Sequence, residues 1–164
     1  MMLTGQLTFF CGKMGAGKST KSLEIARASG AVLLSEDEWL ASLYPGCIQT
    51  LQDYIEYSRR LKPPIKKLVQ DILLAGTDVV MDFPANTVQQ RQWFRDIYSE
   101  INAPHQLIFI NQSDAVCLEQ IARRRESHPE RAATDTEEMF ASVSKHFVAP
   151  TADEGFNLVT INQA

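Results

Sequence analysis

The segment CGKMGAGKST, residues 11–20, carries glycines, a lysine and two hydroxyl side chains at a spacing that suits phosphate binding. Gly12, Gly17, Lys18 and Ser19 fit the pattern G-x-x-x-x-G-K-[ST], and an apolar run precedes them. Glycines let backbone N–H groups close around phosphate oxygens, and the N-terminus of a following helix adds positive potential. The pattern therefore predicts a P-loop that binds ATP. The alternative is a glycine-rich turn with a solvated lysine.

Each residue of the loop has an expected contact. Lys18 reaches the β- and γ-phosphates as a catalytic residue, Ser19 ligates Mg²⁺, and Thr20 adds a hydroxyl to the α-phosphate. The residues predicted to contact the nucleotide are Gly12, Met14, Gly15, Ala16, Gly17, Lys18, Ser19 and Thr20.

A second metal ligand is expected where an apolar run ends in TDVVMDFPANT, residues 77–87. Asp82 follows this run in the manner of a Walker B aspartate, which holds Mg²⁺ directly or through water. The alternative is that Asp82 only starts a turn. Phe83, Trp39 and Tyr44 flank these strand ends, and they either wall an acceptor pocket or belong to the core.

An acidic cluster, SEDEWL in residues 35–40, ends the second predicted strand. The carboxyl ends of parallel strands share one edge of a sheet, so this cluster is expected beside the P-loop. Asp37 is the predicted catalytic base, because a carboxylate near the γ-phosphate can accept the proton of an attacking hydroxyl. The alternative is that Asp37 caps a helix starting at Glu38 or Trp39.

A polar, basic segment is predicted to form a mobile lid over about residues 124–135. Its arginines are Arg123, Arg124, Arg125 and Arg131. Guanidinium groups on a closing lid would neutralise the transferring phosphoryl group and exclude water. Arg124 shares a helical face with Cys117 and Ile121, so it points inward, and Arg124 and Arg131 are the predicted catalytic arginines. The alternative is a solvated basic helix end.

Short apolar runs alternate with helix-period segments, which predicts a three-layer α/β fold with a parallel sheet and helices on both faces. The five predicted strands are residues 6–11, 31–35, 78–82, 106–111 and 157–161. The predicted helices are 18–29, 50–61, 65–75, 86–101, 113–126 and 134–146. Pro63 and Pro64 are expected to separate two of these helices. The expected caps are Asn86, then Ser113 or Asp114, and a capping box of Thr134 with Glu137.

Length and composition set the broad class. At 164 residues the chain fits a single domain, 1–164, and a net charge of -4 argues against extended nucleic-acid binding. Cys11, Cys47 and Cys117 are an odd number without metal-ligand spacing, which favours reduced thiols in the cytoplasm. No run approaches 18 apolar residues, so no membrane association is expected. Oligomeric state stays open.

A guanine-nucleotide switch fits poorly. The segment NQSD, residues 111–114, has a glutamine where the guanine-reading N-K-x-D motif needs lysine. A switch also needs D-x-x-G after the third strand, where Asp82 is followed by Phe83, Pro84 and Ala85.

With these segments and FVAPTADEGFN, residues 147–157, the chain resembles small bacterial ATP-binding proteins labelled AAA-family ATPases. More broadly it is similar to P-loop kinases such as zeta toxins, chloramphenicol phosphotransferase, gluconate kinase and the kinase domain of polynucleotide kinase. The resemblance implies a P-loop NTPase fold with strand order 2-3-1-4-5, a base at Asp37, and lid arginines at Arg124 and Arg131. We set aside the hexameric motor that the AAA label also suggests.

Three functions remain in view. The first is an ATP-dependent phosphotransferase that acts on a hydroxyl of a small-molecule or nucleoside-like acceptor. The second is a kinase for a nucleic-acid 5′ end or a nucleotide sugar. The third is a nucleotide-gated binding protein or regulatory ATPase, in which ATP closes the lid to present a surface to a partner.

Overall fold

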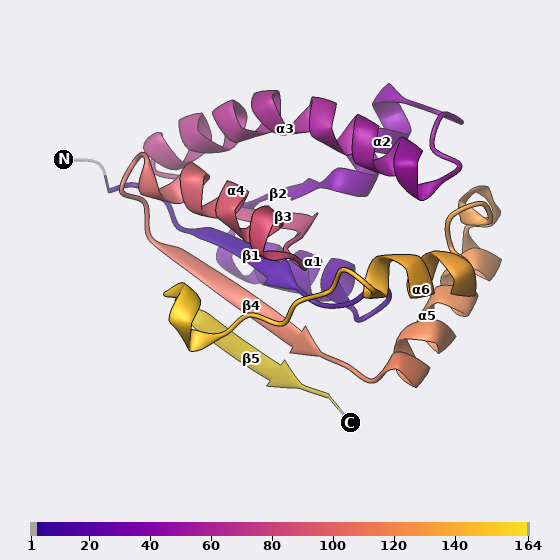
Figure 1. Ribbon diagram of the computed structural model, residues 1–164. Coiled ribbons are helices and arrows are strands. Elements are labelled where there is room, and N and C mark those ends of the chain that lie inside the picture. The colour runs from indigo at the N-terminus through magenta and orange to yellow at the C-terminus, as the bar shows by residue number, and fades with distance from the viewer. Residues whose placement is uncertain (1–2, 164) are drawn as a thin grey trace.

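One parallel sheet organises the part of the chain that the structure, a computed structural model, describes, residues 3–163. Within it five strands lie in the order β2-β3-β1-β4-β5 (Figure 1). The strands are β1 Leu7–Cys11, β2 Val32–Ser35, β3 Val79–Pro84, β4 His105–Asn111 and β5 Leu158–Asn162. Every neighbouring pair is parallel. The predicted fold and strand order are confirmed, and each strand agrees with its prediction to within two residues.

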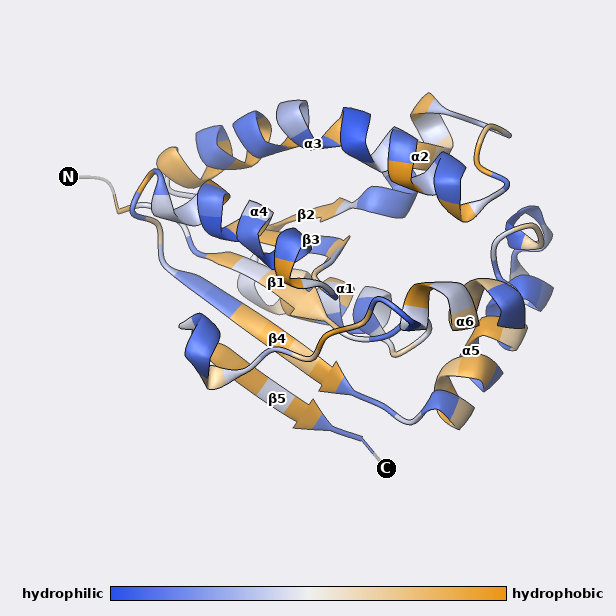
Figure 2. Cartoon of the chain, viewed as in Figure 1, coloured by the Kyte–Doolittle hydropathy of each residue, from blue (hydrophilic) through white to orange (hydrophobic). Residues whose placement is uncertain are grey.

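Helices cover both faces of the sheet. They are α1 Lys18–Ser29, α2 Glu36–Leu43, α3 Leu51–Leu74, α4 Val88–Ser99, α5 Asp114–Ser127 and α6 Glu137–Ser144, with short 3₁₀ turns η1 Pro129–Arg131 and η2 Ala152–Glu154. Side chains of β1 alternate between two cores, because successive residues of a strand point to opposite faces. Phe9 packs with α3 and α4, whereas Phe10 packs with α1, α5 and α6. Figure 2 shows the hydrophobic residues gathered along the central strands.

One long helix, α3, replaces the two helices predicted on either side of the prolines. Pro63 and Pro64 lie inside it and are exposed. The prediction of a break was wrong because a buried stripe continues through the prolines and holds the helix on the sheet. That stripe is Ser58, Leu61, Ile65, Val69 and Leu73. Prolines on the water-facing side leave carbonyls that water can satisfy, so tertiary packing outweighs the lost hydrogen bonds.

The helix starts correct two predicted caps. Thr87, not Asn86, caps α4 by accepting from the Gln90 N–H. Thr136, not Thr134, caps α6, while the Thr134 hydroxyl donates to a backbone carbonyl in the preceding turn. Ser113 caps α5 as expected.

The strand ends place the candidate site. The carboxyl ends of β1, β2, β3 and β4 lead to the P-loop, α2, the β3–α4 loop and α5 respectively, all at one edge of the sheet. Within residues 3–163, no helix is long and apolar enough to cross a membrane.

Candidate active site

The P-loop depends on two glycines with left-handed backbone conformation. Gly15 has φ 79° and Gly17 has φ 106°, which side chains with a Cβ rarely adopt. A Cβ on Gly15 would lie 2.5 Å from the Cys117 carbonyl oxygen, so the loop also packs directly on α5. Cys11 at the end of β1 and Cys117 of α5 are buried. The loop therefore gains its shape from glycine and its support from α5.

The N-terminus of α1 is open. Every other α-helix among residues 3–163 has a side-chain cap, from Ser35, Thr50, Thr87, Ser113 or Thr136. Gly17 precedes α1 without a side-chain cap, and no acidic residue lies in the first turn. The first N–H groups of a helix lack helical partners, and a phosphate can accept from them. This helix start therefore fits a phosphate group.

Lys18 lies half-buried in the loop without an ion-pair partner in the described structure. Its ammonium group donates to the carbonyl oxygens of Gly12 and Lys13, the latter at 3.3 Å. Burial lowers the pKa of Lys18, while the carboxylate of Asp82 partly opposes this shift. A half-buried cation whose hydrogen bonds go only to neutral carbonyl oxygens fits a polyphosphate, which would supply negative charge at close range.

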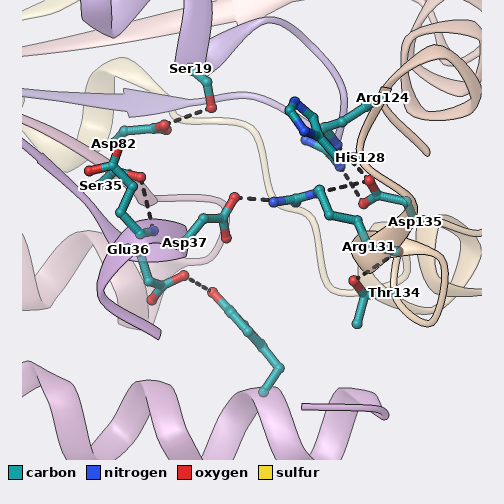
Figure 3. Close-up of polar contacts among 12 residues, drawn as sticks. Ser19, Ser35, Glu36, Asp37, Asp82, Arg124, His128, Arg131, Thr134 and Asp135 are labelled. Carbon is teal, nitrogen blue, oxygen red and sulfur yellow. Dashed lines mark hydrogen bonds and ion pairs between the residues drawn. The ribbon is translucent and has the colours of Figure 1, made fainter. Parts of the chain in front are cut away.

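Ser19 and Asp82 meet at the start of α1. The Ser19 hydroxyl donates to Asp82 Oδ2 at 2.7 Å (Figure 3). Burial raises the pKa of Asp82, and the Ser19 hydrogen bond and Lys18 counteract it. Among residues 3–163 no cluster of three or more His, Cys, Asp or Glu side chains could hold a metal alone. One hydroxyl and one carboxylate fit Mg²⁺, which binds few protein ligands and keeps waters and substrate phosphates.

Asp37 faces the lid from the first turn of α2. Ser35 caps α2 by accepting from the Glu38 N–H at 3.4 Å, so the alternative that Asp37 is the cap was wrong. The Asp37 side chain is 50% exposed, and its Oδ2 lies 3.3 Å from Arg131 Nη2. Its charge reaches Lys18 and Asp82 and affects the pKa of both. The predicted base, metal pair and lysine are therefore together.

The neighbouring carboxyl, Glu36, points away from this group. It is buried and accepts hydrogen bonds from the Tyr54 hydroxyl and, at 2.8 Å, from the Ser58 hydroxyl of α3. Burial raises the pKa of Glu36 to about 7, and both hydrogen bonds oppose that shift. Glu36 fastens α2 to α3, whereas Asp37, one residue on, faces the site.

The lid arginines are held by an acid that the sequence did not single out. Arg124 and Arg131 both contact the carboxylate of Asp135, which is fully buried (Figure 3). Arg123 instead extends into solvent and pairs with Glu119, so Arg124 is the inward residue, as predicted. The lid spans the end of α5, η1 and the turn before α6. Its mobility stays a prediction.

The remaining predicted residues have mixed positions. In the loop, Ala16 is buried, Met14 packs on the core cluster of α1 and α5, and Thr20 is exposed. The aromatic residues are more core than pocket: Phe83 is 1% exposed, and Trp39 and Tyr44 pack half-buried against the same core.

Asn86 is a second residue whose role sequence reasoning missed. Its Oδ1 accepts from the Gly12 N–H at 2.9 Å, and its carbonyl accepts from the Val148 N–H at 2.8 Å. The β3–α4 loop thus fixes the start of the P-loop and joins it to the segment after α6. The available signal was an asparagine directly after a strand end, but from sequence Asn86 was interpreted as a helix cap.

The strand order and the loop between β1 and α1 define a P-loop NTPase fold of the type found in kinases. The chain belongs to the AAA_33 family, whose description is "AAA domain" and whose model matches residues 7–150. Among the curated proteins, none matches this chain.

Solved structures share this fold. A putative kinase from Chloroflexus aurantiacus is similar with a TM-score of 0.74 and 21% identity, over 99% of this chain and 87% of that chain. The APS kinase CysC of Mycobacterium tuberculosis, in complex with AMPPNP and APS, gives 0.63 and 17%, over 98% and 89%. A gluconokinase from Sinorhizobium meliloti gives 0.60 and 16%, over 99% and 84%. The relation to zeta toxins and chloramphenicol phosphotransferase stays a resemblance.

Proposed function

We propose that this protein is an ATP-dependent phosphotransferase that moves the γ-phosphate of ATP to a hydroxyl group of a small-molecule or nucleoside-like acceptor. The observation that carries the proposal is the position of Asp37. Its carboxylate faces the lid arginine Arg131 and stands near the Ser19–Asp82 pair at the edge of the sheet (Figure 3). A carboxylate at that place can serve a hydroxyl that approaches a phosphate held by the P-loop.

The phosphate end of the reaction uses the P-loop. The open N-terminus of α1 and the Lys18 ammonium group would bind the phosphates, and Ser19 and Asp82 would hold Mg²⁺. When bound, Mg²⁺·ATP supplies the transferable group: the acceptor oxygen bonds to the γ-phosphorus as the bond to the β-phosphate side breaks, and ADP leaves. The Ser19 hydroxyl and the Asp82 carboxylate, 2.7 Å apart, are the two side chains that would hold Mg²⁺, which would offset the negative charge of the phosphates.

The acceptor end uses Asp37. The carboxylate orients the acceptor hydroxyl and takes its proton as the oxygen attacks. In the described state Arg131 shares that carboxylate at 3.3 Å. A phosphate competes for the same guanidinium, because charge-assisted bonds to phosphate are strong and bidentate. Phosphate binding therefore draws Arg131 off Asp37 and frees the base.

The lid completes the site. Arg124 and Arg131 bring two positive charges toward the place where negative charge develops on the transferring phosphoryl group. Both arginines are half-buried, so their charges are less screened than those of a surface arginine. The names of similar structures, an APS kinase and a gluconokinase, accord with small-molecule acceptors.

The test is transfer of label from γ-labelled ATP with Mg²⁺ into fractionated cell metabolites. Wild type is compared with Lys18→Ala and Asp37→Asn. We expect a labelled product from wild type alone. Asp37→Asn should still bind ATP, because Asp37 contacts the acceptor and not the P-loop, and its turnover should fall by about 10² to 10⁴-fold. Equal turnover in Asp37→Asn would overturn the base assignment.

The same experiment separates the alternatives. ATP binding with no labelled product in any fraction favours a nucleotide-gated binding protein. Label in a nucleic-acid 5′ end or a nucleotide sugar favours the narrower kinase, and binding to an end with few phosphate contacts would show a shallow dependence on salt.

A further inference from the structure

The lid contains a buried carboxylate that contacts two of its arginines. We propose that Asp135 is the positioning residue of the lid, which sets where Arg124 and Arg131 stand relative to the P-loop and Asp37. The effect of the two arginines on a phosphoryl group rests on the proposed function. The role of Asp135 in placing them rests on the geometry alone.

Asp135 binds the arginines through both oxygens. Arg124 donates from Nη2 to Oδ1 at 2.7 Å and from Nε to Oδ2 at 2.8 Å, which is the bidentate arrangement of a guanidinium and a carboxylate. Arg131 donates from Nε to the same Oδ2 at 2.9 Å. The Asp135 side chain is 0% exposed, so water does not share these bonds.

Asp135 is itself fixed in place by the backbone around it. Its N–H donates to the Arg131 carbonyl at 2.8 Å, and its own carbonyl accepts from Arg125 Nη1 at 3.1 Å. The next residue, Thr136, caps α6. The side chain of Phe140 on α6 is buried in the core cluster of α1 and α5. The carboxylate is thus tied to the sheet, and the arginines are tied to the carboxylate.

Charge explains why one carboxylate can do this. Two guanidinium groups on one carboxylate leave one net positive charge, and they would repel each other at this separation without it. Arg131 spans the gap: Nε binds Asp135 and Nη2 binds Asp37. Once a phosphate draws Nη2 away, the Nε contact to Asp135 still holds the side chain. The arginine can then exchange one partner without leaving the site.

The catalytic benefit of such a group lies in orientation. Guanidinium groups that are placed before the reaction stabilise developing charge without reorganising, and a displacement of about 1 Å can lower a rate by about 10²-fold. Asp135 does not touch the reacting atoms in this arrangement. It acts through Arg124 and Arg131.

The test uses Asp135→Asn, which keeps the shape of the side chain and removes its charge. The matched control is Glu130→Gln, an acid of the same lid that is 71% exposed and pairs with His128. With Mg²⁺·ATP and water as acceptor, we expect kcat to fall by about 10 to 10²-fold in Asp135→Asn, with the Kd for ADP within about threefold of wild type. Glu130→Gln should behave as wild type.

The effects should also overlap. Because Asp135 acts through Arg131, adding Asp135→Asn to Arg131→Ala should lower kcat by clearly less than the product of the two single losses. Losses that multiply in full, or a kcat of Asp135→Asn within about twofold of wild type, would overturn the proposal. Should Asp135→Asn fail to fold, Asp135→Glu replaces it. It keeps the charge but shifts the carboxylate by one methylene, so kcat should still fall while ADP binds.

Two further readouts need no turnover. In the protein without nucleotide, trypsin should cut after the lid arginines about 10-fold faster in Asp135→Asn than in wild type or Glu130→Gln, because the released lid opens more often. In Asp135→Asn the ratio of the Kd for ADP to the Kd for AMPPNP should also be smaller than in wild type. If wild type binds ATP but transfers no phosphoryl group, the proposed function fails, while unchanged trypsin rates and an unchanged Kd ratio would sink the role of Asp135.

Discussion

Glu36 gives a prediction whose size follows from the structure. Its carboxyl group is 3% exposed, and burial raises its pKa from 4.5 to about 7. The folded protein therefore keeps the Glu36 proton over a pH range in which the unfolded chain has released it. Stability falls with rising pH wherever the folded state binds more protons than the unfolded state. The free energy of unfolding therefore decreases as pH rises from about 4.5 to about 7.

The size of the decrease can be worked out. At about 1.4 kcal/mol for each pH unit between the two pKa values, the ionised Glu36 carboxylate costs about 3 kcal/mol above about pH 7. Most of this decrease falls between about pH 5 and pH 8. Glu36→Gln removes the titration and keeps the shape, and its amide can still bond the Tyr54 and Ser58 hydroxyls. The variant should therefore gain stability relative to wild type as pH rises.

The assay is urea unfolding of wild type and Glu36→Gln at several pH values, followed by circular dichroism. The difference between the two proteins cancels the titrating groups that do not interact with Glu36. Glu38→Gln, which changes the exposed acid two residues along α2, is the control and should follow wild type. Parallel curves for wild type and Glu36→Gln from about pH 5 to pH 8 would refute the reasoning, because they would mean that Glu36 titrates normally.

Three other substitutions test the framework of the site. Gly15→Ala should lower stability by about 2 to 4 kcal/mol and weaken ATP binding, because the new Cβ would lie 2.5 Å from the Cys117 carbonyl and φ is 79°; an unchanged midpoint in urea would contradict this. Arg91→Met should lower the free energy of unfolding by about 3 to 5 kcal/mol, because the half-buried Glu154 carboxylate loses its fully buried ion-pair partner. Thermal unfolding measures this loss, and an unchanged melting temperature would show that the ion pair contributes little. Asn86→Ala should raise the Kd for ATP about 10-fold and lower stability by about 1 to 3 kcal/mol, because the Gly12 N–H of the P-loop loses its acceptor; calorimetric titration with an unchanged Kd would contradict that role.

Local patterns predicted most of the fold and several side chains that the structure brings together at the candidate site. Strand ends, the glycine spacing and the apolar runs are local features of the sequence, so Lys18, Ser19, Asp37 and Asp82 could be named from it. The strand order followed from the resemblance. The structure brings these four side chains together at one edge of the sheet.

Contacts across the sequence could not be predicted in this way. Asn86 and Gly12 are 74 residues apart, so nothing local signals their hydrogen bond. Asp135 lies in a polar segment without apolar periodicity, and only the folded turn brings its carboxylate onto Arg124. The prediction of a helix break at the prolines of α3 failed for the opposite reason. There, the buried stripe on both sides of the prolines outweighs their low helix propensity.

The two prolines of α3 also shape how that helix can deform. Pro63 and Pro64 cannot donate to the carbonyls of Arg59 and Arg60, so two consecutive backbone hydrogen bonds are missing on the exposed side of the helix. A helix bends most easily where such hydrogen bonds are missing. We therefore expect α3 to behave as two stiff segments that bend most easily at Pro63 and Pro64.

The two segments of α3 have different contacts. The segment after the prolines packs on the sheet through Ile65, Val69 and Leu73. The segment before them carries Tyr54 and Ser58, which donate to Glu36 in the first turn of α2, next to Asp37. Bending at Pro63 and Pro64 would therefore move α2, and with it Asp37, relative to the P-loop. In the proposed phosphotransferase this movement would change the width of the space beside Asp37, so that acceptors of different size could enter.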